Sequence, residues 1–209
     1  MPQEGHFYAL RGDAYLLQKK LPAASEAYTE AIARNDQFFY YYLQRGLIAE
    51  HQRADGKARA DLETSLKLLP TGAAYFALGN IAARARNSEA ARQYYAAAAS
   101  SEGEIGQAAA RELMRLELPQ NPGKYVRTEA GLDGRGMLVV AVGNPTPLPV
   151  TGLSIAVQYV DAEGRLREIR RNFSGTLAAG QQSQIATGLG PFQSADQFKV
   201  ALTSARIAE

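Results

Sequence analysis

The sequence predicts an α plus β protein of two domains: an α-solenoid of three helix pairs with a capping helix, followed by an antiparallel β-sandwich. The first observation is a pattern that recurs at steps of 34 and then 33 residues, as Tyr8, Gly12, Ala24, then Tyr42, Gly46, Ala58, then Tyr75, Gly79, Ala91. A period of this size is typical of stacked helix pairs. The second observation is a change near Pro119–Gly123, from helical spacing of Ala, Leu and Tyr to two-residue alternation of Val and Thr. We therefore expect a repeat domain over residues 1–118 and a β domain over residues 119–209.

Each repeat predicts two antiparallel helices. Leu21-Pro22 ends the first helix of the first pair, Asp55-Gly56 forms the turn of the second pair, and Asn87 or Ser88 is a candidate N-cap in the third. The recurring glycine and alanine have a mechanical reason, because two helices cross closely only where a small side chain faces a bulky one. In this register Tyr42 is the aromatic residue that packs between the helices of the second repeat.

A further helix is expected over Glu104–Leu118. Its apolar residues would cover the exposed end of the stack, as terminal repeats must: Ala108, Leu113, Leu116 and Leu118.

The β domain follows from short alternating segments that are separated by turn residues. The expected strands are Tyr125–Ala130, Met137–Gly143, Leu153–Val160, Leu166–Phe173, Gln182–Ala186 and Phe198–Ile207. Short antiparallel strands with such punctuation indicate a sandwich of immunoglobulin-like type. The stretches Val139–Asn144, Val150–Asp161 and Leu177–Gly180 resemble small immunoglobulin-like domains of bacterial envelope proteins.

Composition excludes several kinds of function. The 23 basic and 21 acidic residues nearly balance, so no strong field favours nucleic acid or an anionic membrane. The chain has no cysteine. It contains no run of about 18 apolar residues, so we expect no membrane insertion. Residues 1–10 lack the apolar core of a signal peptide, so the given sequence predicts no export signal there. The aromatic run Phe38–Tyr42 could stack on bases, but the repeat accounts for most of it and no basic surface surrounds it. We expect no nucleic-acid partner.

The inventory for catalysis is small. The chain contains neither HExxH nor Gly-x-Ser-x-Gly nor a Walker loop, so we expect no catalytic residues. A zinc site formed by His6, His51 and a carboxylate is an alternative, but two polar residues on one face explain these histidines more simply.

The first helix of each pair in such a stack lines a concave face, where we expect a peptide-binding groove. Its predicted residues are Tyr40, Leu43, Leu47, His51, Phe76, Asn80 and Arg84. The centre of this surface is apolar, which favours an apolar segment or a helix of a protein partner. Alternatively, the capping helix or the β domain fills the groove.

The repeats resemble the tetratricopeptide repeat (TPR) over roughly residues 5–103. Several positions recur together in all three copies, although Arg11 and Arg45 stand where the family usually has Leu, and Asp36 and Gly103 replace its closing Pro. Chaperone-docking members of that family grip a C-terminal carboxylate with several Lys, Asn and Arg residues. Asn80 and Arg84 alone do not reproduce this set, which argues against a carboxylate clamp.

The two domains together resemble the non-catalytic C-terminal tail of bacterial CAAX-prenyl-protease-like HExxH zinc metallopeptidases. The segments that carry this resemblance are Gly5–Phe7, Phe38–Leu47, Leu66–Pro70, Ser101–Gly106, Asn144–Val150 and Gly188–Phe192. The resemblance implies a periplasmic or envelope-associated protein, envelope assembly machinery as a possible partner, and zinc only in an upstream domain that is missing here, with no cofactor in this chain. It also implies that the chain presents substrates or docks the protease.

Two functions therefore remain open. One is this interaction tail of an envelope protease, and the other is a free-standing repeat adaptor that scaffolds a cytoplasmic or envelope complex. An upstream, in-frame HExxH would favour the first of them.

Overall fold

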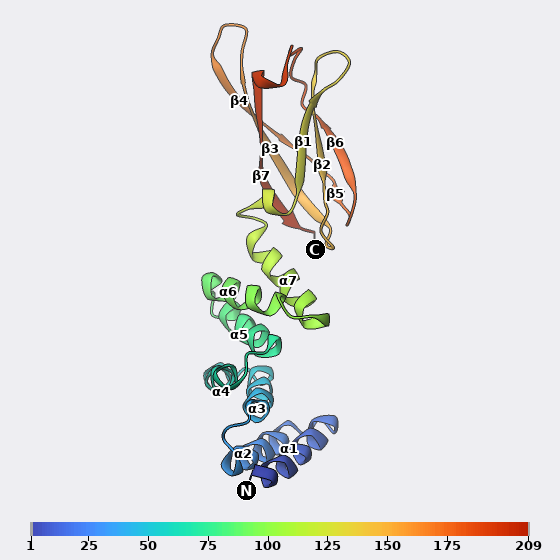
Figure 1. Ribbon diagram of the computed structural model, residues 1–209. Coiled ribbons are helices and arrows are strands. Elements are labelled where there is room, and N and C mark those ends of the chain that lie inside the picture. The colour runs from blue at the N-terminus through green and yellow to red at the C-terminus, as the bar shows by residue number, and fades with distance from the viewer. Residues whose placement is uncertain (1, 209) are drawn as a thin grey trace. The chain divides into compact units, whose positions relative to one another are not determined.

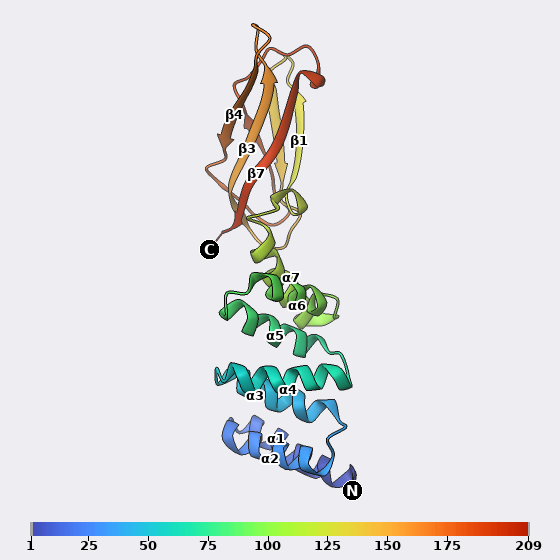
Figure 2. The same ribbon diagram turned by 90° about the vertical axis from the view of Figure 1, so that its left-hand side faces the viewer.

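The computed structural model describes residues 2–208, and the side chains of residues 4–208. The chain divides into two compact units, with the boundary in the sequence between Leu113 and Met114 (Figure 1). The helices of the described chain are α1 (Pro2–Leu17), α2 (Leu21–Arg34), α3 (Phe39–His51), α4 (Asp55–Leu68), α5 (Gly72–Arg84), α6 (Ser88–Ala99) and α7 (Gly103–Glu117). Figure 2 shows α1 to α6 stacked in sequence order as antiparallel pairs. The predicted helical repeat architecture is confirmed.

The recurring glycines lie where the two helices of each pair cross. A Cβ atom on Gly12 would lie 2.8 Å from the Tyr28 ring, one on Gly46 would lie 2.9 Å from Leu62 Cγ, and one on Gly79 would lie 2.6 Å from the Tyr95 ring. These distances are shorter than any ordinary carbon contact, so each glycine is required by a bulky residue of the second helix. The mechanical explanation of the pattern is confirmed.

The aromatic residue of the second repeat was assigned to the wrong position. Tyr41 is fully buried, whereas Tyr42 is only half-buried and its ring lies 6.0 Å from the Arg45 guanidinium. Tyr41 belongs to the cluster that joins α1, α2 and α3. Three tyrosines in a row cannot all face inward on a helix, and contacts with the preceding repeat select the middle one.

Helix α7 contributes residues to both units, whereas the sequence predicted only a cap for the helical stack. Ala109 in the middle of the helix is fully buried, and Ile105 in its first turn lies beside Gly72 at the start of α5. Met114 and Leu118, in contrast, belong to the hydrophobic core of the second unit. The predicted capping role is therefore wrong for Leu118, because this side chain packs into the β unit. The boundary between the two compact units follows Leu113, five residues before the expected one.

The second unit consists of two antiparallel sheets. One has the order β1-β2-β6, with β1 (Arg127–Leu132), β2 (Leu138–Gly143) and β6 (Gln182–Ala186). In the other, β3 (Val150–Val160) pairs with β4 (Leu166–Asn172), β5 (Thr176–Leu177) and β7 (Phe198–Ile207). Short 3-10 turns precede β1 at Pro122–Lys124 and β7 at Ala195–Gln197. The predicted strands are found close to the expected places, and only the short β5 was not expected.

One hydrophobic core lies between the two sheets. Val140 and Val142 of β2 and Ile155 and Val157 of β3 are all fully buried in it. The alternation that predicted these strands is the alternation that points their side chains into this core. The finer immunoglobulin-like assignment stays a prediction.

A buried Asn144 organises the proline-rich segment after β2. Its amide nitrogen donates to the carbonyl oxygens of Leu148, Leu177 and Ala178 at 2.8 to 3.1 Å. Its Oδ1 accepts from the Thr146 hydroxyl and amide. This side chain supplies hydrogen bonds that prolines cannot make, so its role is structural.

Candidate protein-binding surface

The predicted groove residues lie on two first helices, Tyr40, Leu43, Leu47 and His51 on α3 and Phe76, Asn80 and Arg84 on α5. Leu43 is buried in the core of the helical unit, so it offers no contact surface. Tyr40, Leu47 and Phe76 are half-buried, and His51 is exposed. The expected apolar surface is therefore smaller than the sequence indicated, because one of its central residues packs inward.

The polar members of the predicted groove bond to other parts of the chain. Asn80 Oδ1 accepts a hydrogen bond of 2.9 Å from the Tyr95 hydroxyl. Arg84 donates to Glu50 at 2.5 Å and to Asp55 at 2.7 Å. The guanidinium is already neutralised by two carboxylates, which strengthens the case against a carboxylate clamp.

The Arg84–Asp55 pair predicts a specific loss of stability in acid. The hydrogen bond from Arg84 holds the pKa of Asp55 below its ordinary value of 3.8. A carboxyl group whose pKa is lowered by folding stabilises the folded state above its unfolded pKa, and that contribution disappears as the pH falls through the folded pKa. We therefore expect the unfolding free energy to fall more steeply below about pH 4 in the parent chain than in Asp55→Asn.

Urea denaturation followed by circular dichroism at a series of pH values measures this difference. In an Arg84→Met background the Asp55→Asn substitution should change the pH dependence little, because the partner that lowers the pKa is gone. Equal slopes for the parent chain and Asp55→Asn would show that the pair contributes nothing.

Asp13 of α1 joins the first three helices. Its Oδ1 accepts hydrogen bonds from the hydroxyls of Tyr28 at 2.5 Å and Tyr40 at 2.8 Å. Burial, together with the Asp13 carboxylate, raises the pKa of Tyr40 to about 12 and that of Tyr28 further. Both tyrosines therefore keep their protons at physiological pH and act as donors.

A surface pocket opens beside this carboxylate, between α1 and the start of α3. Its volume is about 380 Å³, and its lining is almost entirely apolar: His6, Ala9, Leu10, Asp13, Phe38, Tyr40 and Tyr41. The His6 ring meets the Phe38 ring edge-on with a centroid distance of 5.2 Å. The Tyr41 hydroxyl lies 3.1 Å from His6 Nδ1. The lining polar groups thus bond to one another, which leaves an aromatic hollow suited to an apolar side chain.

Sequence reasoning located this pocket only in part. It named Tyr40 as a groove residue and His6 as a polar residue of one face, but it gave Phe38 and Tyr41 no binding role. The available signal was the repeat itself, because Tyr41 follows Phe7 by 34 residues and shares its repeat position.

The alternative zinc site does not form. His6 lies beside Tyr41 in the aromatic pocket, whereas His51 is exposed at the far end of α3. Over the side chains of residues 4–208, no three His, Cys, Asp or Glu residues are grouped in a way that could hold a metal ion.

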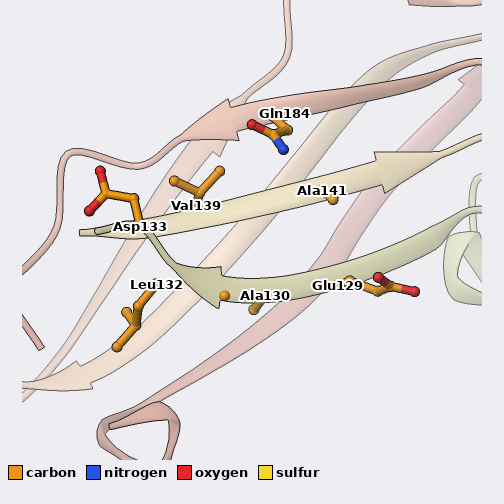
Figure 3. Close-up of a pocket in the computed structure, with 8 residues that line it drawn as sticks. Glu129, Ala130, Leu132, Asp133, Val139, Ala141 and Gln184 are labelled. Carbon is orange, nitrogen blue, oxygen red and sulfur yellow. The ribbon is translucent and has the colours of Figure 1, made fainter. Parts of the chain in front are cut away.

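A second hollow of about 340 Å³ lies over the β1-β2-β6 sheet (Figure 3). Ala130, Val139 and Ala141 are among the residues that line it. Asp133 at its edge accepts hydrogen bonds from the backbone of its own turn, at 2.8 Å from Arg135 and 2.9 Å from Met137. These bonds lower the pKa of Asp133 and occupy its carboxylate. This carboxylate is therefore engaged within its own turn, and Glu129 and Gln184 are the other polar residues that line the hollow.

Comparison with known proteins identifies the helical fold. No family model and no curated protein matches the chain. Among solved structures, the TPR domain of Arabidopsis OM64 is similar with a TM-score of 0.50 and 20% identity, covering 54% of this chain and 95% of that domain. The first TPR domain of Spaghetti (RPAP3), bound to the HSP90 peptide SRMEEVD, has a TM-score of 0.51 and 18% identity over 56% of this chain and 93% of its own. The Sgt2 TPR domain of Aspergillus fumigatus has a TM-score of 0.50 and 18% identity, and the match covers 63% of this chain and 89% of that domain.

The helical unit therefore has the TPR fold, as the sequence predicted. At these identities the likeness concerns architecture and carries no binding partner with it. A search for membrane-crossing helices over the described residues finds no helix with the required length and apolar character.

Proposed function

We propose that the chain is a protein-interaction module, and that the pocket between α1 and α3 receives an apolar side chain from a partner peptide or helix. The single observation that carries this proposal is the aromatic pocket around Tyr40, whose polar groups are satisfied internally. Apolar, largely preformed hollows of this size are typical anchor sites, and the TPR architecture presents them along its first helices. The exposed Leu10 at the rim adds further apolar surface.

The proposed ligand differs from the HSP90 peptide seen with the RPAP3 domain. That peptide ends in EEVD and is strongly acidic. In this chain Arg84 is held by Glu50 and Asp55, so a terminal carboxylate finds no free cation there. We infer that recognition depends on an apolar anchor rather than on a chain terminus.

Selection from a random peptide library, followed by affinity measurement, tests the proposal. The selected peptides should contain a large apolar residue and should bind equally well after C-terminal amidation. Replacing both His6 and Tyr40 with alanine should weaken their binding by about tenfold or more, because the anchor loses its aromatic walls.

Leu166→Ser is the matched control, since it removes an exposed apolar side chain of β4 that lies outside the pocket. It should leave the affinity of these peptides unchanged. Unaltered binding by the His6→Ala/Tyr40→Ala variant, at unchanged helical circular dichroism, would place the binding site elsewhere.

We further propose that this module is the substrate-presenting or docking tail of an envelope zinc metallopeptidase. The support is the resemblance of six segments, among them Phe38–Leu47 and Asn144–Val150, to such tails. On this proposal the protein is periplasmic or envelope-associated, its partners include envelope assembly machinery, and zinc resides in an upstream catalytic domain.

The upstream reading frame tests this finer proposal. An in-frame HExxH segment is the expected result. A stop codon followed by a ribosome-binding site before Met1 would overturn it and leave a free-standing repeat adaptor, with pocket binding unaffected.

A further inference from the structure

Helix α1 carries an apolar stripe that nothing in the described chain covers fully. Phe7, Leu10 and Leu17 are 72%, 64% and 88% exposed, and Ala14 between them is exposed as well. Their spacing of three, four and three residues places them along one face of the helix. Scattered exposed apolar residues are ordinary, but a continuous helical stripe indicates a contact surface.

The burial of the equivalent residues in the second and third repeats can be compared with that of the stripe. The residues one repeat and two repeats after Phe7 are Tyr41 and Ala74, and both are fully buried. The corresponding residues for Ala14 are Ile48 and Ile81, which are also buried. The positions of Phe7 and Ala14 are thus internal in the second and third repeats and exposed only in the first, whereas the equivalents of Leu17 are the exposed His51 and the half-buried Arg84.

In the later repeats the second helix of the preceding pair covers these positions. Helix α2 packs on α3, and helix α4 packs on α5. Tyr41 and Ile48 share a cluster with Ala31 of α2, and Arg45 donates a hydrogen bond of 3.1 Å to the Thr29 hydroxyl of α2. The natural occupant of this face is therefore an amphipathic helix with small apolar residues at its centre.

Charge specifies the occupant further. Arg45 forms a bidentate pair of 2.7 Å bonds with Asp61 of its own second helix. The repeat equivalents are Arg11 and Ala27, so α2 offers Arg11 no carboxylate at that position. The Arg11 guanidinium instead lies over the rings of Tyr8 and Tyr15, at 5.4 and 6.0 Å.

The end of the stripe is basic as well. Lys19 and Lys20 follow Leu17 and are exposed. We propose that the stripe of Phe7, Leu10, Ala14 and Leu17 binds an acidic amphipathic helix of a partner protein, which lies on α1 as α2 lies on α3 and pairs a carboxylate with Arg11.

A synthetic helix can test this proposal without knowledge of the partner. The probe is a helix-stabilised peptide with the sequence of α2, residues 21–34, in which Thr29→Glu places a carboxylate where α2 meets Arg45. Because the chain has no cysteine, Ala14→Cys gives one labelling site for an environment-sensitive dye. Titration calorimetry with the unlabelled, full chain gives the affinity independently.

We expect saturable binding and a dye response at residue 14. Phe7→Ser should lower the affinity by about tenfold or more, because a large apolar side chain leaves the contact. Leu166→Ser in β4 is a matched control, since Leu166 is also 72% exposed, and it should change nothing. Arg11→Gln should weaken the Thr29→Glu peptide more than the unmodified α2 peptide.

Three results would overturn the proposal: no saturable binding, equal affinity for Phe7→Ser, or equal effects of Arg11→Gln on both peptides. Sedimentation of the chain alone provides a further check. A dimer that Phe7→Ser converts to monomer would assign the stripe to a second copy and exclude a partner helix. His6→Ala/Tyr40→Ala leaves the stripe intact, so failure of the pocket and failure of the stripe are separable.

Discussion

Replacement of Tyr41 by alanine is expected to destabilise the helical unit by about 3 to 5 kcal/mol, the usual cost of removing a large buried aromatic side chain. Tyr41 is fully buried, its hydroxyl lies 3.1 Å from His6 Nδ1, and its ring lies 5.0 Å from that of Phe38. The substitution would open a cavity where the first and second repeats meet. Urea denaturation of the full chain, followed by circular dichroism at 222 nm, measures the loss because the helices dominate that signal.

Tyr42→Ala is the matched control for this experiment. The two residues are adjacent and identical in type, but Tyr42 is half-buried and lies against the Arg45 guanidinium. Its removal should cost about 1 kcal/mol, the scale of a partly exposed cation–π contact with some lost packing. A larger loss for Tyr42→Ala than for Tyr41→Ala would contradict the register of α3.

Gly79→Ala is expected to destabilise the third repeat by about 1 to 3 kcal/mol, although alanine is the better helix former. The added Cβ would lie 2.6 Å from two atoms of the Tyr95 ring. That ring cannot easily move, because its hydroxyl donates to Asn80 and the Phe76 ring packs 5.8 Å away. The cost of overpacking should therefore exceed the gain in helix propensity.

Gly56→Ala supplies the opposite case. Gly56 lies in the first turn of α4, and a Cβ added there would meet no atom within 4 Å. Alanine should stabilise the chain by about 0.5 kcal/mol at this position, since only the flexibility of glycine in the unfolded state is lost. Shifts of the same sign in the two variants would contradict the proposed reason for the repeating glycines.

The candidate surface illustrates what a sequence can and cannot specify. Tyr40 lies on the first helix of its pair, α3, and lines the pocket, and helical spacing relates it directly to the repeat. Leu43 was assigned to the same surface but packs into the core. Both positions suit an apolar side chain, and only the helices packed around them decide which one faces solvent.

Arg84 shows the same limit for charged residues. Its position on α5 followed from the repeat, but its partners Glu50 and Asp55 come from another repeat, 34 and 29 residues away. Hydrogen bonds between such distant residues depend on tertiary packing and leave no periodic signal. The sequence suggests that Arg84 is available to a ligand, but in the structure its guanidinium is already bonded to Glu50 and Asp55.

The sequence by itself determined the helix pairs, the small residues at their crossings and the alternation of the strands. These features repeat at 3.6-residue, 2-residue or 34-residue intervals, so local geometry is enough to reveal them. Tertiary structure alone decided that Tyr41 rather than Tyr42 is buried, that Leu118 belongs to the β core, and that Phe7 and Ala14 are exposed although their equivalents in the later repeats are buried. The reason is physical: burial depends on which neighbour arrives from elsewhere in the chain, and adjacent residues with the same chemistry do not encode that choice.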